Sequence, residues 1–472
     1  MKPEPQLGVP IWRAYGPELV RMFEFSRELK RIFHAESLKE ELVGGDLSLL
    51  ELLDLNLLMS EARAADVAAG RIGAEDRPTR QLEAAVIWRE IARRTGDAVA
   101  LRKAASAAEL AGAGFGRDHR PQAWARARCE QASAAILGAE AFGDDGLNAA
   151  ADVAFTEAKA AGKAGLAVSL AAAGLALVEA RTALRSSDRA ETLDVAALFD
   201  GPAETLDAHG KKRPLGRLLA ARARMDRAEF LTGCGLRLKD PHLLRMALDG
   251  LSQILARLDR NYEPLSWARA ITLQASAKTA LCDLDGEIGM VAHVVDDLVS
   301  VLEHVSRDHS PMDWARAQMA LAAGLQMLAE VGDSTPAFDQ ALKCLDRALS
   351  VFDVQPALLE RANALYRRSS CLLRRAELTG KVEALDAAEA ALRAELISLN
   401  PSADPVGWAV RQLNFARLYE AREDLTGPDS KTRRSAAVAL SAALDVFAEH
   451  GLRSLSDVAL RGLERLKEPT AH

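Results

Sequence analysis

Arginine recurs at a fixed distance from a rare aromatic residue, and this spacing is the feature of the chain best suited to binding chemistry. Arg126, Arg269 and Arg316 each come two residues after a tryptophan, and Arg361 comes two residues after Leu359, which takes the tryptophan's place. Two residues correspond to about 200° around an α-helix. If the tryptophans pack inside, these arginines face outward. A guanidinium group in that position can hold a carboxylate through two parallel hydrogen bonds.

The richest stretch carries Arg361, Arg368 and Arg375 at intervals of seven residues, which keeps them on one helical face. Arginine and amide side chains together can bind an acidic peptide or a carboxylate. The alternative is a solvated face whose charge nearby glutamates balance. The candidate partner-binding residues are Arg269, Arg316, Arg361, Asn363, Arg367, Arg368, Arg375, Arg411 and Asn414.

Three other patterns resemble chemical sites but lack an essential part. The glycines of 112–116 resemble a phosphate-binding turn, but no strand precedes them, so a loop between repeats explains them better. Residues 294–297 hold two aspartates typical of helical magnesium sites, but Ser300 stands where the last carboxylate belongs. His293 and His304 share a helical face but lie about 16 Å apart along it, too far to bind one ion. We therefore expect no catalytic residue, no cofactor and no metal.

The tryptophans belong to a repeated motif in which a proline stands three residues before a Trp-Ala pair. The motif begins at Pro121, Pro264, Pro311 and Pro405, and with weaker copies it gives a period of about 45 to 50 residues. Proline fits the first turn of a helix, and glycine is typical of helix ends. Apolar residues recur every three or four positions in between. The sequence thus predicts an all-α chain of about eight helix pairs, two of them degenerate.

These units resemble tetratricopeptide-type (TPR-like) repeats of a longer, divergent bacterial kind, over roughly residues 78–450. The resemblance rests on the proline-led Trp-Ala opening, on the small residues Ala322, Ala323 and Gly324, and on an apolar second helix such as 341–351. It implies an α-solenoid in a right-handed superhelix whose first helices line a concave groove. The period exceeds the roughly 34 residues of the standard repeat, so the family's ligand residues cannot be transferred by position. HEAT-like stacking is the alternative fold.

The expected organisation has four parts. Residues 1–75 form an N-terminal helical cap, residues 76–210 and 211–451 form two sets of TPR-like repeats, and residues 452–472 form a capping helix with a disordered tail. The division near residue 210 follows from Asp200–Pro214, a stretch bounded by glycine and proline and basic at its end. We interpret this stretch as a loop that acts as a hinge, a contact site or a plain insertion.

Two helices are expected in the cap. The first is amphipathic and covers Pro17–Glu41, and the second follows a cap at Asp46 and opens with the leucine-rich segment Leu47–Met59. That segment is apolar on nearly every face. A helix buried in the cap explains it, and so does a surface for homodimerisation or membrane docking. It is too short to span a bilayer.

Composition limits the classes of partner. The net charge of −7 gives no overall electrostatic case for nucleic acid or an anionic membrane. Five cysteines lie far apart inside helical patterns, which is typical of buried free thiols in a reducing compartment. No stretch approaches 18 uncharged apolar residues, so we expect no membrane span and a cytoplasmic location.

The sequence therefore favours a non-enzymatic scaffold or adaptor that binds one or more proteins, through an acidic or extended segment, in the groove of a TPR-like superhelix. An accessory or regulatory subunit of an enzyme complex is the alternative. A helical-toroid enzyme and a nucleic-acid binder are less favoured, because no catalytic constellation and no basic domain occur in the sequence.

Overall fold

The structure is a computed structural model, and it describes residues 48–71, 76–161, 165–184, 188–210, 214–286, 288–354, 357–398, 401–402, 405–427, 429–449 and 453–467. Within these ranges the regular elements are α-helices and one short 3₁₀ helix, η1 (Ile288–Met290). The expected helix over Pro17–Glu41, the cap at Asp46, the basic end of the 200–214 stretch and the expected disordered tail lie outside the described residues.

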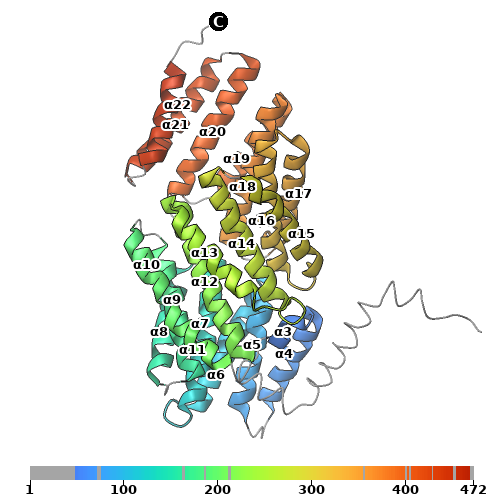
Figure 1. The fold of residues 1–472 in the computed structure, drawn as a ribbon, viewed down its shortest axis with the longest axis vertical. Helices are drawn as coiled ribbons and strands as arrows, with labels where there is room; N and C mark the ends of the chain where they lie inside the picture. The colour runs from blue at the N-terminus through green and yellow to red at the C-terminus, as the bar shows by residue number, and fades with distance from the viewer. Residues whose placement is uncertain are drawn as a thin grey trace, which may run out of the picture.

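Eight successive helix pairs make up most of the described chain (Figure 1). We call the first helix of each pair its A helix and the second its B helix. The pairs are α5 (Arg77–Thr95) with α6 (Ala98–Phe115), α7 (Pro121–Phe142) with α8 (Asp145–Ala161), α9 (Leu166–Ala183) with α10 (Arg189–Ala197) and α11 (Asp200–Gly210), α12 (Pro214–Leu238) with α13 (Pro241–Leu255), α14 (Pro264–Asp285) with α15 (Val291–His304), α16 (Pro311–Val331) with α17 (Thr335–Phe352), α18 (Leu358–Thr379) with α19 (Val382–Ser398), and α20 (Pro405–Thr426) with α21 (Ser430–Glu449).

The pairs are flanked by further helices. α3 (Ser48–Leu52) and α4 (Leu55–Gly70) precede them, and α22 (Arg453–Lys467) follows them. From α4 onward every helix packs against the next one in the chain. This sequential packing confirms the predicted all-α solenoid of about eight TPR-like helix pairs.

The motif prolines begin the A helices, as predicted. Pro121, Pro264, Pro311 and Pro405 are the first residues of α7, α14, α16 and α20. An N–H group at this position has no hydrogen-bond partner inside the helix. Proline, which lacks the N–H, therefore loses no hydrogen bond there.

Glycines end several A helices in the left-handed conformation, which a residue without Cβ adopts freely. Gly143 and Gly286, with φ angles of 64° and 71°, are the C-caps of α7 and α14. After α16 the left-handed residue is Asp333 (φ 45°), one position beyond Gly332. The predicted breaks between A and B helices are confirmed at these points.

The Trp-Ala pairs sit where neighbouring helices approach closely. The four alanines are buried almost completely, whereas the four tryptophans are only partly buried and pack at the margins of the core. The alanines are Ala125, Ala268, Ala315 and Ala409. The small residue therefore forms the tightest contact, and the tryptophan covers it.

The superhelix touches itself after one turn. α5 packs against α16 and α7 packs against α18, while α3 packs against α12 and α14. The C-terminal helices α20 to α22, red in Figure 1, extend away from this closed part at one end of the molecule. The closure places the A helices of distant pairs around a common interior.

The leucine-rich segment was predicted to form one continuous helix, and this prediction is wrong. It divides at Asp54, whose carboxylate accepts a hydrogen bond from Leu57 N (2.8 Å) and caps α4. Leu50, Leu53 and Leu58 are buried in the core of the same chain. These leucines are therefore covered by the chain's own helices.

The prediction of a loop after residue 200 is wrong for the described residues, because they form α11. Asp200, Gly201 and Pro202 do separate two helices, but proline in the first turn of α11 starts a helix instead of preventing one. Phe199, fully buried, and Leu206 hold α11 against α9 and α12. The B helix of the third pair is therefore divided into α10 and α11.

α9 is the one helix in the described part of the chain that is long and apolar enough to cross a membrane. It packs as the A helix of the third pair against α7, α8, α11 and α12, with half of its residues buried there.

Candidate functional site

The A helices enclose a cavity of about 1780 Å³. Its walls come mainly from α7, α9, α12, α14 and α16, with further residues from α3, α5, α8 and α18. Because α5 contacts α16, helices of one superhelical turn surround this interior, which stays open to solvent. It is the natural place to look for function.

The same helix positions face the cavity in different pairs. The sixth residue lines it in α7, α14 and α16, and all three of these residues are arginines: Arg126, Arg269 and Arg316. The twentieth residue lines it in the same helices, and all three are acidic: Glu140, Asp283 and Glu330. At 1.5 Å per residue, arginine and carboxylate stand about 21 Å apart along each helix.

The arginines at the first of these positions are held by carboxylates. Arg269 contacts Asp226 (2.8 Å) and Glu229 (2.9 Å) on α12, and Arg316 contacts Glu360 (2.6 Å) on α18. Burial alone would lower the pKa of Arg269, but the two carboxylates raise it above its usual range. These ion pairs join successive A helices across the cavity wall.

Arg126 is less completely satisfied. Its side chain is 7% exposed and lies 2.8 Å from Glu130, yet none of its three guanidinium nitrogens makes a hydrogen bond. Glu130 is shared with Arg89 of α5, at 2.7 Å. Arg126 is therefore buried in the cavity wall and held there by the charge of Glu130.

Arg367 on α18 lines the cavity without a carboxylate partner among the described residues. Its side chain is exposed to solvent within the cavity. Asn363 lies one turn earlier on the same helix and also lines the cavity. Together they offer donors to a ligand that carries oxygen acceptors.

Carboxylates are the commonest charged groups of the lining. Asp152, Glu179 and Asp283 are exposed in the cavity and have no ion-pair partner among the described residues. Burial raises the pKa of Glu140, while Arg181, 2.6 Å away, opposes this effect. Burial also raises the pKa of Asp226 to about 6, with Glu229 adding to the shift. The carboxyl groups thus outnumber the cations that could neutralise them.

The structure brings four of the nine sequence-predicted candidates to the cavity. They are Arg269, Arg316, Asn363 and Arg367. The carboxylates at the other end of the cavity were not singled out from the sequence, although an acidic residue fourteen positions after Arg126, Arg269 and Arg316 was a usable signal.

Three candidates form a ladder with the preceding helix. Arg361, Arg368 and Arg375 of α18 pair with aspartates of α17 and its C-cap at 2.6 Å, 2.6 Å and 2.7 Å. The aspartates are also spaced by seven residues, in antiparallel order: Asp353, Asp346 and Asp339. None of these arginines lines the cavity.

The reason is a shift of register. α18 begins at Leu358, so its sixth residue, equivalent to Arg316 of α16, is Asn363 and not Arg361. Two positions turn a side chain by about 200°. The last two candidates, Arg411 and Asn414, lie on α20 away from the cavity, and Arg411 pairs with the buried Glu395 at 2.7 Å.

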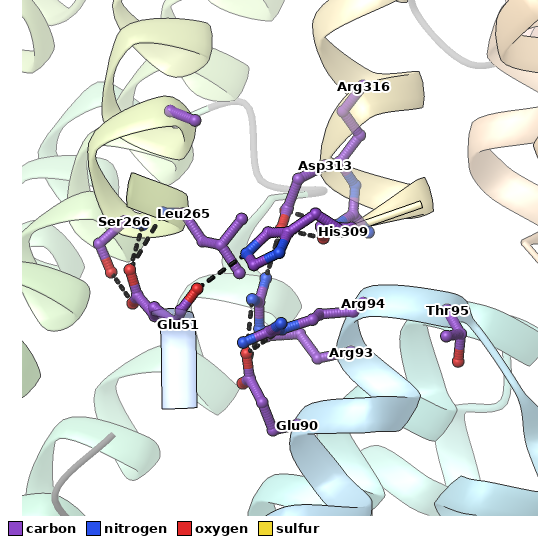
Figure 2. A network of polar contacts seen from close by, with 12 residues as sticks. Glu51, Glu90, Arg93, Arg94, Thr95, Leu265, Ser266, His309, Asp313 and Arg316 are labelled. Atoms are coloured by element: carbon purple, nitrogen blue, oxygen red, sulfur yellow. Dashed lines mark hydrogen bonds and ion pairs between the residues drawn. The ribbon is translucent and has the colours of Figure 1, made fainter. Parts of the chain in front are cut away.

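A buried polar network closes the turn beside the cavity (Figure 2). Glu51 of α3 accepts hydrogen bonds from the backbone N–H groups of Leu265 (3.1 Å) and Ser266 (2.9 Å) and from the Ser266 hydroxyl (2.5 Å). It thereby caps the N-terminus of α14, which has no side-chain cap of its own. Arg222 lies 3.2 Å from the same carboxylate.

The second half of this network joins α5 to α16. Arg93 lies 2.9 Å from both Glu90 and Asp313, and Arg94 pairs with Glu90 at 2.8 Å (Figure 2). Burial would raise the pKa values of Glu90 and Asp313, but the arginines hold both below their usual range. His309 meets the Glu51 carbonyl at 2.8 Å. Sequence inspection missed this network because its contacts to α14 and α16 join residues more than two hundred positions apart.

The two histidines considered from the sequence, and His309 near them in the chain, do not form a common site. His293 is exposed, His304 contacts the Ser300 carbonyl (2.7 Å), and His309 belongs to the closing network. Among the residues that the structure describes, no three His, Cys, Asp or Glu side chains are grouped as metal ligands.

Comparison with known proteins adds two similar structures. No protein-family model and no curated protein matches the chain. A crystal structure of Rap protein complexed with competence and sporulation factor covers 86% of this chain and 98% of its own, at 12% identity and a TM-score of 0.44. A circular tandem repeat protein with a novel repeat topology covers 88% and 96%, at 18% identity and a TM-score of 0.26. The class of the protein, a TPR-like α-solenoid, follows from its own stacked helix pairs.

Proposed function

We propose that this protein is a non-enzymatic adaptor that holds a segment of a partner protein inside its closed superhelical turn. The supporting observation is the cavity of about 1780 Å³ walled by A helices. Sites for small molecules usually occupy about 300 to 1,000 Å³, so the cavity has room for a polypeptide segment.

The lining suits such a guest. Its middle is apolar, with Leu273 of α14 and Met319 and Ala323 of α16. Arg367 and Asn363 supply donors without internal partners, which suits an acidic side chain or a chain-terminal carboxylate. An extended or helical segment therefore finds a polar anchor beside an apolar wall.

We also propose a cytoplasmic location. All five cysteines are buried and unpaired, which suits a reducing compartment.

The adaptor proposal is tested with a random peptide library selected on the full chain. Calorimetry then measures the affinity of each selected peptide for wild type, Arg367→Ala and Arg368→Ala. Arg367→Ala should weaken binding roughly tenfold or more, because it removes the free donor group of the cavity. Arg368→Ala is the matched control, since the neighbouring arginine pairs with Asp346 outside the cavity.

If no peptide is selected above background, or if both variants weaken binding equally, the cavity is not the binding site. An unchanged affinity of Arg368→Ala also shows that the general positive charge of α18 is not responsible for binding.

A further inference from the structure

Large apolar side chains are exposed where three A helices end. Phe142 is 39% exposed, Leu184 is 39% exposed and Leu236 is 47% exposed. They lie at the C-terminal ends of α7, α9 and α12, and all three line the cavity. We call this set the apolar rim. Scattered exposed apolar side chains need no explanation, but these three share the lining of one cavity, and apolar side chains gathered at a cavity are typical of a partner-binding surface.

Negative charge predominates around the apolar rim, where Arg181 is already paired with Glu140. Asp283 stands near the end of α14, Glu179 stands near the end of α9, and Asp152 faces the cavity from α8. None of the three has an ion-pair partner among the described residues. Over the whole cavity thirteen carboxylate and eight arginine side chains form the lining, and no lysine does. The arginines near the start of the A helices are largely paired with carboxylates. The negative charge that remains unneutralised therefore lies at the rim.

Helix stability does not account for these positions. A carboxylate in the last turn of a helix faces the partial negative charge of the free carbonyl groups, which costs about 0.3 to 1 kcal/mol. Glu140, Asp283 and Glu330 occupy such positions in α7, α14 and α16. Carboxylates and helix C-termini together make this end of the cavity attractive to cations.

We infer that the partner segment is basic and amphipathic, with apolar side chains against the apolar rim and lysine or arginine side chains beside Asp152, Glu179 and Asp283. This inference rests on the proposed adaptor function and specifies the chemistry of the partner. Complementary charge sets the choice of partner and its rate of encounter, and the apolar contacts supply the larger share of the affinity.

The test uses the same peptide library on three forms of the full chain. The first is wild type, and the second is the triple variant Asp152→Asn, Glu179→Gln, Asp283→Asn. The third is a charge-matched control, Glu109→Gln, Asp249→Asn, Glu303→Gln, whose residues are exposed on the B helices α6, α13 and α15.

Peptides selected on wild type should be enriched in lysine and arginine next to apolar residues. Their affinity should fall by roughly tenfold or more with the cavity triple variant and by less than about twofold with the control. The inference is overturned if the selected peptides lack basic residues, or if both triple variants weaken binding equally. Peptides that depend on Arg367 but ignore the three carboxylates would uphold the adaptor function and refute the basic partner. Circular dichroism of each variant excludes loss of fold.

Discussion

Among single side chains, Asp226 has the environment most sensitive to pH. It is crowded by Glu229 and Glu140 and held by Arg269, and burial raises its pKa to about 6. In an unfolded chain an aspartate titrates near pH 4. Folding therefore takes up a proton at this residue between about pH 4 and pH 6.

We predict that Asp226 makes the protein less stable as pH rises through that range. The folded state binds more protons than the unfolded state there, so the free energy of unfolding falls with increasing pH. Relative to wild type, Asp226→Asn should gain on the order of 2 kcal/mol between pH 4 and pH 7. Urea unfolding of both proteins across this range measures the difference. A constant difference would show that Asp226 titrates normally.

The cysteine thiols should be inert in the folded protein. All five are buried, and burial raises the pKa of Cys129 and of Cys371 to about 12. A thiol reacts as its thiolate, which is almost absent at such a pKa.

Iodoacetamide at about pH 8 should therefore label no cysteine in the native protein and all five after unfolding in urea. Mass spectrometry of the intact chain counts the labels. Rapid native labelling of Cys129 or Cys371 would contradict the burial of these thiols.

The helices show what kind of information a sequence pattern holds. Proline, glycine and apolar periodicity act within one helix or turn, and the starts at Pro121, Pro264, Pro311 and Pro405 were predictable from them. The direction in which an arginine points is also determined by the local sequence. Which helix lies opposite that arginine is not. The seven-residue arginine stripe of α18 therefore indicated a common face without revealing the aspartates of α17.

The predicted groove and the observed cavity differ for the same reason. Arg269 and Arg316 line the cavity because their helices keep the register of the motif, whereas α18 begins later and places Asn363 there. Where an A helix lacks the Trp-Ala pair, the sequence does not locate its first residue to within two positions. The closing network could not be predicted, since Glu51 and Ser266 meet only after a full superhelical turn.

The ladder between α17 and α18 should contribute little to stability compared with the buried pair in α5. Arg368 and Asp346 are largely solvated, so Arg368→Ala should cost about 0.2 to 1 kcal/mol. Arg94 is fully buried, pairs with Glu90 and donates to the carbonyls of Leu50 and Leu53. Arg94→Ala should cost about 3 to 5 kcal/mol, because it leaves Glu90 without one of its two arginines.

Chemical unfolding of the two variants provides the comparison. Equal losses in the free energy of unfolding would have one of two meanings. Either the charges of α5 are more hydrated than their burial implies, or the arginine–aspartate ladder works as a cooperative unit.

For the whole molecule, closure changes how stability is distributed. In an open solenoid each repeat contacts only its neighbours, so a local defect spreads only to adjacent repeats. Here Arg93 of α5 contacts Asp313 of α16, and α7 packs against α18. The pairs from α5 to α18 are therefore coupled at both ends, whereas α20 to α22 remain outside the closed turn.

We predict that Arg93→Ala loosens helices far from it in sequence. Amide hydrogen exchange should accelerate in α5, α14 and α16 together and stay unchanged in α20 to α22, because Arg93 joins α5 to α16 and α14 packs against α16. Arg422→Ala is the control, since Arg422 joins only α20 to neighbouring α19 through Asp386 and Glu389. Faster exchange confined to α4, α5 and α6 would mean that the molecule behaves as an open array.

The cap that Glu51 provides for α14 also has a consequence during protein synthesis. Glu51 leaves the ribosome 214 residues before Leu265, the first amide that it caps. At about 5 to 20 residues per second, this wait lasts roughly 10 to 40 s. During that time the carboxylate and the leucines beside it have no partner from α14, and the cavity does not yet exist. We therefore expect that the closed turn cannot form on a nascent chain before its fifth helix pair has emerged.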